Sequence, residues 1–418
     1  MGALVVAALT AALIAGCGSS SSSGTSSAAK NAKTAPTAKA SGNVTWCIGK
    51  DTTGAFSTMV SRFNQANPGA KAKLLELPTS ADQQRTQLIQ RLRAKSPECD
   101  VLGIDVVWTG EFAGQGWIRD VGSLIDKRQG DFIPSTIKTA QFDGKTWAVP
   151  FNTNAGFLFY RKSKVSSAPG TWQDVYKDAQ KDGGIVYQGS RYEGLTVNYL
   201  ELLYSDGGKI VDDSGTKLDL DKNKATEVLS FMANGIKDGA APKANVTYME
   251  EESRRAFEGG KPAFMRNWPY AYALGLKSKI GKDFAVAPLP AWQGGKPASV
   301  LGGYNLAISS YSKNPAGAAA FIDFVTKPAQ QQVMAAKASL PPVIGSVYDD
   351  PAVKKAMPFA AELKKAVEQG QSRPVSAVYP QITEAIFKNV YSALQGSSSP
   401  SAAVNKMSSQ VESALKTF

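Results

Sequence analysis

Residues 44–69 read VTWCIGKDTTGAFSTMVSRFNQANPG, and this stretch sets the pattern that decides the fold. It begins with an apolar run, Val44 to Ile48, that has the length and composition of a buried strand. Apolar side chains from Phe56 to Phe63 then recur at i, i+3, i+4 and i+7, the spacing of an amphipathic helix. Asn67-Pro68-Gly69 predicts the end of that helix, because proline and glycine interrupt helical structure.

The same alternation continues toward the C-terminus. A strand is predicted from Lys73 to Leu77, and Leu88, Ile89 and Leu92 mark a second helix. The run Val101 to Val107 is rich in β-branched residues, as in a strand that is buried on both faces. The order βαβαβ predicts an α/β fold with a mostly parallel sheet, whose ligands gather beyond the carboxyl ends of the strands.

The chain of 418 residues is too long for one compact core, since single cores stop growing at about 250–300 residues. We therefore expect two lobes. A first crossover is predicted at Phe151 to Gly156, and it leads into a strand from Phe157 to Tyr160. A return strand is predicted from Leu301 to Ile308. Helices and loops are expected between them as far as about Ala285. Further helices are predicted at Ala318 to Val325, Pro351 to Glu368, Gln381 to Leu394 and Ser401 to Leu415.

Composition excludes several functions. The sequence has no histidine, which excludes a Ser-His-Asp triad and a zinc site with histidine ligands. The net charge is +12, but the lysines are scattered along the chain and are not massed on one segment among aromatic residues. That distribution disfavours nucleic-acid binding.

The N-terminus predicts export and lipidation. The apolar run Gly2 to Gly16 is shorter than the roughly 20 residues that span a bilayer, so a signal peptide over residues 1–17 fits better than a membrane helix. Small residues precede Cys17 and a serine tract follows it, which is typical of a lipobox. No Lys or Arg stands before the run, and an ordinary signal peptide with an incidental cysteine is the alternative. We expect an extracytoplasmic protein, anchored by a lipid on Cys17 to the outer face of the cell membrane.

Residues 18–42 are mostly Ser, Ala, Thr and Gly, which cannot bury enough apolar surface to order the chain. They predict a flexible linker. Its lysines, Lys30, Lys33 and Lys39, either lie against anionic headgroups or are solvated.

Two further cysteines, Cys47 and Cys99, would meet a disulfide-permissive environment after export. Cys47 lies in the first predicted strand and Cys99 opens the run that is expected to neighbour it. We therefore predict a Cys47–Cys99 disulfide, with two buried free thiols as the alternative.

Six segments resemble, in the same order, landmarks of the family of extracellular sugar-binding proteins that includes maltose-binding protein. They are Asp105–Trp108 with Gly116–Val121, Gly144–Pro150, Phe159–Lys162, Phe257–Met265 with Asn267–Pro269, Ala287–Pro290, and Gly302–Ile308. The fourth is the most specific, and the similarity covers nearly the whole mature chain. Three further segments are similar to trehalose-binding lipoproteins, namely Trp108–Glu111, Arg191–Gly194 and Arg373–Ser376.

The resemblance implies a two-lobed periplasmic-binding-protein-like fold, in which two discontinuous α/β domains are joined by a hinge and close around a sugar. The expected bounds are 43–150 with 301–343 for the first lobe and 151–300 with 344–418 for the second. It also implies a monomer that hands a disaccharide to the permease subunits of an ABC importer, with no cofactor, no metal, no chemical step and no nucleic acid.

A sugar needs directional polar partners for its hydroxyls and flat aromatic surfaces for its ring faces. The candidates in the first lobe are Asp51, Asp105, Trp108 and Glu111. Those in the second are Asn152, Asn154, Tyr192, Glu193, Trp268, Tyr270 and Arg373, and Tyr304 and Asn305 lie by the return crossover.

Each of these hypotheses has an alternative. Asp105 could cap a turn, and Trp268 could belong to a lobe core. Glu111 and Glu193 could be solvated, and Arg373 could pair with an acid between the lobes. A secreted glycoside hydrolase, with Glu111 and Glu193 as its two carboxylates, is the rival function. The same fold binding a glycerophosphodiester, a polyol or a peptide is a second rival.

Overall fold

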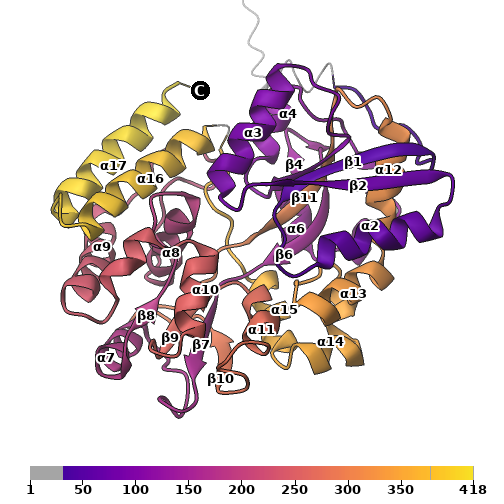
Figure 1. Ribbon diagram of the computed structural model, residues 1–418. Coiled ribbons are helices and arrows are strands. Elements are labelled where there is room, and N and C mark those ends of the chain that lie inside the picture. Colours follow the sequence, from indigo (N-terminus) through magenta and orange to yellow (C-terminus); the bar gives the residue numbers. More distant parts are fainter. Residues whose placement is uncertain (1–31, 377, 418) are drawn as a thin grey trace, which may run out of the picture.

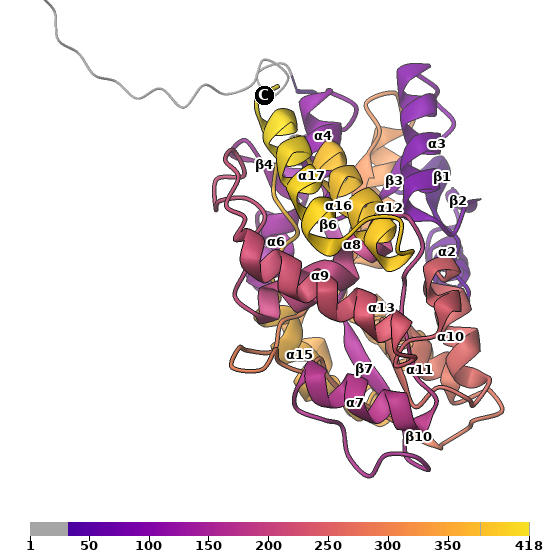
Figure 2. The same cartoon turned by 90° about the vertical axis from the view of Figure 1, so that its left-hand side faces the viewer.

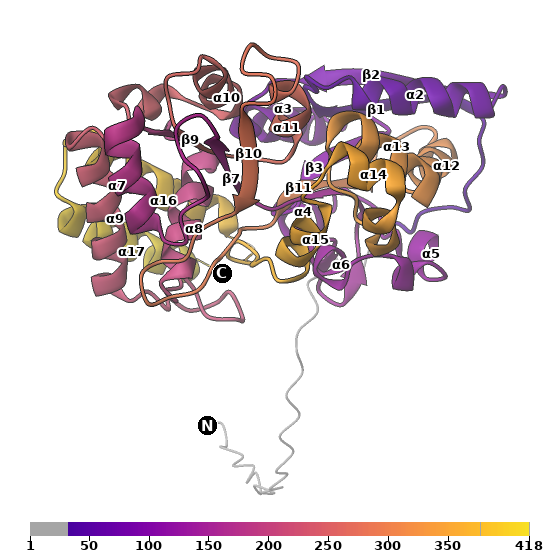
Figure 3. The ribbon, with the colours of Figure 1, turned by 90° about the horizontal axis from the view of Figure 1, so that it is seen from below.

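The computed structural model describes residues 32–376 and 378–417. The predicted signal peptide, Cys17 and more than half of the predicted linker lie outside these residues. Within them the chain forms two lobes, each a sheet with helices packed against it, and the chain passes between the lobes more than once (Figures 1 and 3). This confirms the predicted two-lobed α/β fold.

The first lobe contains a five-stranded sheet with the strand order β2-β1-β3-β11-β6. Its strands are β1 (Gly42–Gly49), β2 (Ala70–Leu77), β3 (Val101–Asp105), β6 (Val149–Asn154) and β11 (Gly302–Ile308). β1 pairs in parallel with β2 and β3, as the βαβαβ order predicts. The returning strand β11 runs antiparallel to β3 and β6.

Several helices belong to the first lobe. They are α2 (Ala55–Ala66), α3 (Ala81–Arg93), α4 (Thr109–Gly114), α5 (Gly122–Ile125), α6 (Pro134–Thr139), α12 (Pro315–Val325) and α13 (Pro328–Ala338). A hairpin, β4 (Gln141–Phe142) with β5 (Lys145–Thr146), and the short turn η1 (Gln129–Asp131) complete it. α2 ends at Ala66, just before the predicted Asn67-Pro68-Gly69 stop.

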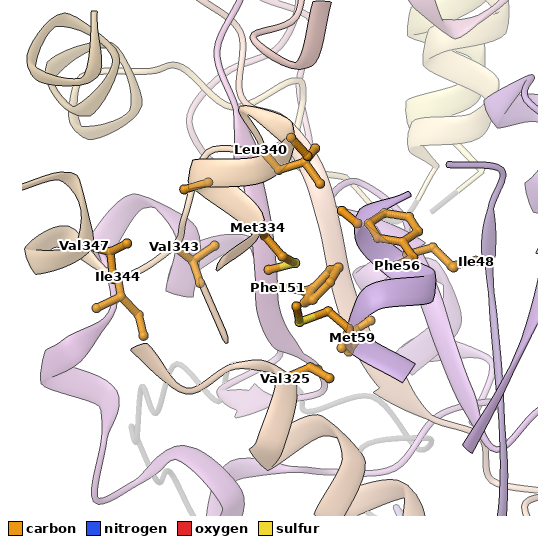
Figure 4. Close-up of a cluster of buried hydrophobic side chains, with 14 of the residues drawn as sticks. Ile48, Phe56, Met59, Phe151, Val325, Met334, Leu340, Val343, Ile344 and Val347 are labelled. Carbon is orange, nitrogen blue, oxygen red and sulfur yellow. The ribbon is translucent and has the colours of Figure 1, made fainter. Parts of the chain in front are cut away.

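A buried cluster joins the helices of this lobe to its sheet (Figure 4). Phe56 and Met59 on α2 are directed toward Phe151 on β6 and Met334 on α13. Leu340, in the segment after α13, lies in the same cluster and also borders the space between the lobes. The packing of this cluster therefore fixes one wall of that space.

The second lobe contains a four-stranded sheet with the order β10-β7-β9-β8. Its strands are β7 (Phe157–Arg161), β8 (Ile185–Val186), β9 (Phe264–Asn267) and β10 (Phe284–Pro288). The expectation of helices and loops as far as about Ala285 was wrong, because it missed β8 and β9 and the start of β10. Strands of two to five residues are too short to show a periodic pattern.

Helices surround the second sheet. They are α7 (Trp172–Asp182), α8 (Glu193–Ser205), α9 (Lys222–Lys237), α10 (Glu250–Glu258), α11 (Tyr270–Gly275), α16 (Tyr379–Leu394) and α17 (Pro400–Leu415), with the short turn η2 (Lys243–Thr247). α17 packs along α16 and α9 on the outside of the lobe (Figure 2). The helices predicted at 381–394 and 401–415 are thus confirmed.

The predicted helix from Pro351 to Glu368 is two helices, α14 (Pro351–Ala356) and α15 (Ala360–Glu368). Pro358 lies between them, where its missing N–H and its ring exclude a continuous helix. η3 (Gly345–Asp349) precedes them. α14 packs on α13 of the first lobe, whereas α15 contacts both α6 and β10. The lobe bounds inferred from the sequence stay a prediction.

Within the described residues, the chain crosses between the sheets at three places. β6 leads directly into β7 and β10 leads to β11, near the two crossovers predicted. The segment between α15 and α16 is a third crossing, in which the N–H of Leu301 donates to the carbonyl of Gln371 at 2.9 Å. The sequence analysis did not anticipate that this segment, which carries Arg373, runs beside the second crossover.

The last residues of the predicted linker follow the surface of the first lobe. The N–H of Ala35 donates to the carbonyl of Asp120 at 2.7 Å, and the N–H of Asp120 donates to the carbonyl of Lys33 at 3.0 Å. Ala35 is buried. Residues 32–41 therefore differ from the flexible linker expected, because main-chain pairing, which composition does not reveal, holds them.

The predicted disulfide is confirmed, with Cys47 on β1 joined to Cys99 just before β3. No helix within residues 32–376 and 378–417 is both long enough and apolar enough to cross a membrane.

Candidate functional site

A cavity of about 440 Å³ lies between the lobes. This volume is within the range of about 300–1,000 Å³ that small-molecule sites occupy. The segments after β1 and β2 and the last residue of β3 line one side, and residues at the start of α8, α10 and α11 line the other. Ten of the predicted ligand-binding residues line it: Asp51, Asp105, Asn152, Asn154, Tyr192, Glu193, Trp268, Tyr270, Tyr304 and Arg373.

On the first-lobe side, side chains at the strand ends are held in place by hydrogen bonds from the backbone and from other side chains. Oδ1 of Asp51 accepts from the N–H of Thr53 at 2.8 Å and Oδ2 from the N–H of Phe56 at 2.9 Å, which fixes the carboxylate at the start of α2. The hydroxyl of Tyr304 donates to Gln84 at 3.0 Å. Gly49 lies against both of these side chains, and any Cβ there would collide with them.

Arg373 joins the two lobes at the base of the cleft. One guanidinium nitrogen lies 2.6 Å from Oδ1 of Asp105, at the end of β3, and another lies 2.7 Å from Oε1 of Glu193, the first residue of α8. The N–H of Glu193 donates to Asp82 of α3 at 3.2 Å. These contacts link the two lobes across the cleft. The alternative that Arg373 pairs with acids between the lobes is therefore observed.

Glu193 is a buried carboxylate with many partners. The hydroxyl of Tyr379 donates to it, and the hydroxyl of Thr383 donates to its Oε2 at 2.6 Å. Burial raises the pKa of Glu193, and the positive charge of Arg373 opposes that rise. Burial also raises the pKa of Asp82 across the lobe boundary.

Aromatic rings and acids of the second lobe form the other wall. The guanidinium of Arg266 lies over the ring of Trp268, 4.0 Å from its centroid. The hydroxyl of Tyr192 donates to Glu250 at 2.7 Å, and that of Tyr270 donates to Glu251 at 2.7 Å. Burial raises the pKa of Glu250, and the hydrogen bond from Tyr192 opposes that rise.

Two buried polar atoms of cleft residues have no hydrogen-bond partner within the described part of the chain. They are Oδ1 of Asn154, an acceptor, and Nε of Arg373, a donor. Buried polar groups are nearly always hydrogen-bonded, because leaving one unsatisfied costs about 1–3 kcal/mol. A ligand hydroxyl can both accept and donate, so it can satisfy either atom.

Three predicted residues lie outside the cleft. Trp108 is 3% exposed and stacks on Phe112 in the core of the first lobe, with ring centroids 6.2 Å apart. Its N–H donates to the carbonyl of Asp105 in a tight turn, which directs the chain into α4 and away from the cleft. Glu111 pairs with Arg85. The assignment of Trp108 and Glu111 to the cleft was wrong.

The third is Asn305, which is 1% exposed. Its amide donates to the carbonyl of Thr139 at 3.1 Å and to the hydroxyl of Thr109 at 3.3 Å. These bonds fix β11 to its neighbours. Assignment of Asn305 to the cleft was wrong because its side chain is on the face of β11 opposite to that of Tyr304.

The sequence analysis missed several cleft residues. They are Lys50, Thr52, Thr53, Phe56, Thr79, Ala81, Gln84, Gly194, Val197, Met249, Glu250, Glu251, Glu252, Arg255, Gly302, Gly303 and Leu340. The acidic run Glu250 to Glu252 has a local signal, but that signal is the one expected of any helix start, where carboxylates are stabilised. Only the tertiary fold brings it to the cleft.

Comparisons with known proteins agree with this architecture. Over 365 residues the chain is 38% identical to a probable ABC transporter-binding protein of Deinococcus radiodurans, covering 82% of this chain and 86% of the relative. The structure of maltose-bound MalE3 of T. maritima superposes with a TM-score of 0.84 at 32% identity, covering 89% of this chain and 99% of that one.

The GacH receptor of Streptomyces glaucescens, solved without ligand and with acarbose, shares the fold, with a TM-score of 0.81 at 24% identity over 91% of this chain and 100% of that one. Residues 49–332 match a family described as bacterial extracellular solute-binding protein. The match covers both walls of the cleft and two of the three crossings. With a polar and aromatic cleft between its two lobes, the chain belongs to the bacterial extracellular solute-binding protein family.

Proposed function

We propose that this protein captures a neutral sugar, a disaccharide such as trehalose or maltose, and delivers it to an ABC importer. In this proposal Cys17 carries the lipid that anchors the protein to the outer face of the membrane. The observation that carries the proposal is the content of the cleft, an aromatic wall at Trp268 facing carboxylates and unsatisfied polar atoms. Ring faces pack on aromatics, and hydroxyls bond to charged and amide groups.

The charges of the cleft favour a neutral ligand over a phosphodiester. Six of the residues that line the cleft are acidic and three are basic. Two of the basic side chains already have carboxylate partners, Arg373 with Asp105 and Glu193, and Arg255 with Glu252. An anionic ligand would therefore meet an excess of like charge, which opposes binding.

The geometry also disfavours the hydrolase. Its two proposed carboxylates were Glu111 and Glu193, which must face each other across the sugar. Glu111 is outside the cleft and bound to Arg85, and Glu193 is bound to Arg373. Transport is also favoured by the names of relatives, which include a maltotriose-binding protein of Pyrococcus abyssi, 27% identical over 255 residues.

Closure would couple capture to delivery. A sugar that touches both walls of the cleft favours the closed state by its differential affinity for that state. Asp105 and Glu193, on opposite lobes, both pair with one arginine. The importer would then recognise the closed form.

The test is a thermal-shift screen against trehalose, maltose, sucrose, glucose, glycerophosphocholine and a peptide mixture. A ligand at 100 times its Kd adds about 2.7 kcal/mol to the free energy of unfolding, which shifts the midpoint measurably. We expect a disaccharide to raise the midpoint. A shift with glycerophosphocholine or peptide alone would contradict the proposed substrate, and release of monosaccharide during incubation would contradict transport without hydrolysis.

A further inference from the structure

We propose that Arg266 and Glu201 are positioning residues for the ligand, because they fix Trp268 as a platform with one face open to the cleft. Neither residue lines the cleft, and both side chains are almost completely buried, at 1% and 0% exposure. The proposal rests on the proposed function, since it explains how the same cleft would hold the ring of a sugar.

Three hydrogen bonds fix the orientation of the planar guanidinium group of Arg266. Its Nε donates to Oε2 of Glu201 at 2.7 Å, and Nη2 donates to Oε1 of Glu201 at 2.5 Å. Nη1 donates to Oε1 of Gln188 at 2.9 Å. A bidentate pair with a third bond leaves the planar group no freedom to rotate.

That fixed plane lies against the indole of Trp268, with Cζ of Arg266 4.0 Å from the ring centroid. Because Arg266 is buried, the face of the ring that it covers is closed to any ligand. Trp268 still lines the cleft, so a ligand contacts its other face or its edge. The backbone is fixed as well, since the N–H of Trp268 donates to Oδ1 of Asn267 at 2.8 Å.

Glycines leave room for this arrangement. A Cβ at Gly156 would collide with the carboxylate of Glu201 and the guanidinium of Arg266, and a Cβ at Gly302 would lie 3.1 Å from the ring of Trp268. A buried ion pair is weak evidence for stability, because apolar residues of similar volume often stabilise a fold equally well. An apolar pair in place of Arg266 and Glu201 would have no fixed planar group to orient the indole of Trp268, so orientation of the indole explains the presence of this ion pair.

The first test is Arg266→Lys, since lysine can still bond to Glu201 but has no planar group to cover the indole. We expect this variant to bind the disaccharide about fivefold more weakly than the wild type. Arg161→Lys is the matched control, because Arg161 also pairs with a carboxylate, Asp283, but lies at the opposite end of β7 from Phe157, which pairs with Asn267. Its affinity should be unchanged.

A double-mutant cycle separates positioning from a general structural effect. In the Trp268→Ala background, Arg266→Lys should cause no further loss of sugar affinity, because its effect acts through the indole. Arg266→Met combined with Glu201→Met should fold, since it removes both charges together, and should also bind more weakly. Full additivity in the cycle, or wild-type affinity in the double methionine variant, would overturn the proposal.

A readout without ligand keeps this test distinct from the proposed function. The chain contains 7 tryptophans, and labelling with 5-fluorotryptophan gives a ¹⁹F resonance for each, with that of Trp268 assigned from Trp268→Phe. We expect this resonance to be narrow in the wild type and in Arg161→Lys, and shifted or broadened in Arg266→Lys. An unchanged resonance in Arg266→Lys would overturn the positioning role, whether or not a sugar binds.

Discussion

Arg373 holds together two carboxylates that would otherwise repel each other. Asp105 from β3 and Glu193 from α8 both accept hydrogen bonds from its guanidinium. Burial raises the pKa of Glu193, and the positive charge of Arg373 opposes that rise. One side chain from the third crossing thus links the charges of both lobes, while its buried Nε has no hydrogen-bond partner among the described residues.

Trp268→Ala should weaken binding of the disaccharide by more than tenfold, because aromatic anchors in binding sites contribute about 2 kcal/mol or more. Trp108→Phe is the matched control, since Trp108 is an aromatic residue of the core that does not line the cleft. Calorimetric titration of both variants measures the effect. Equal affinities for Trp268→Ala and wild type would remove Trp268 from the site.

Glu250 should make stability depend on pH. Its pKa is raised from 4.5 by burial. Its contribution to the free energy of unfolding is therefore fully present below about pH 4.5 and is lost as the pH rises through the raised pKa. The melting temperature of the wild type minus that of Glu250→Gln should therefore fall between pH 5 and pH 7.5. A difference that is constant, or that rises with pH, would show that the carboxyl group is not penalised by burial.

Much of the site could be predicted at this scale, but not the direction of each side chain. Asn152, Tyr192 and Tyr304 were predicted from their loops and strands, and they line the cleft. Trp108 and Asn305 were predicted on the same grounds, yet a tight turn and the alternation of β11 direct them into the core. The sequence predicts where a residue lies along a strand, but tertiary packing decides whether its side chain points into the cleft.

At the scale of elements, the approach of β11 to β6 requires glycine. Gly303 has φ +112°, and a Cβ there would collide with the carbonyl of Asn152. The neighbouring residue, Gly302, lies close to the ring of Trp268, so a side chain there would contact the ring. The strand that returns to the first lobe therefore depends on two residues without side chains.

Gly303→Ala should lower the free energy of unfolding by more than the roughly 1–3 kcal/mol of backbone strain alone, because a clash is added. Gly294→Ala is the control, since Gly294 has φ +82° but open space around it. Urea denaturation measures the free energy of unfolding of both variants, and so compares backbone strain with a clash, in Gly303→Ala, to backbone strain without one, in Gly294→Ala. Equal losses would mean that β11 shifts to accept the side chain.

The elements that could be predicted were those long enough to show a period. α2 and β1 follow from residues 44–69. β8, with two residues, carries no pattern, and the break between α14 and α15 at Pro358 was overlooked although proline signals it. Boundaries were missed where local signals were short, and the overall alternation was still sufficient to give the fold class.

At the scale of the molecule, the part of the chain that the structure describes joins the two lobes by three crossings that lie close together. The pairing of Leu301 with Gln371 aligns the second and third crossings, and Arg373 follows two residues later. Motion of the lobes must therefore move Arg373 relative to at least one of its acids. Any relative motion of the lobes would consequently also rearrange the charges of the cleft.

The disulfide should act on stability and not on binding. It closes a loop with a sequence separation of 52, and neither cysteine lines the cleft. The double variant Cys47→Ser/Cys99→Ser should lose about 2–4 kcal/mol of unfolding free energy. Its sugar affinity at a temperature where it remains folded should be that of the wild type, and a large loss of affinity would connect the disulfide to the cleft.

Calorimetric titration of the protein with trehalose and maltose, beside glycerophosphocholine and a peptide mixture, tests the central claim most directly. The account predicts saturable binding of a disaccharide at one site per chain and no binding of glycerophosphocholine or of the peptides. Binding of glycerophosphocholine or peptide with no heat from either sugar would contradict it, and would show that the charges and the indole of the cleft serve another class of solute.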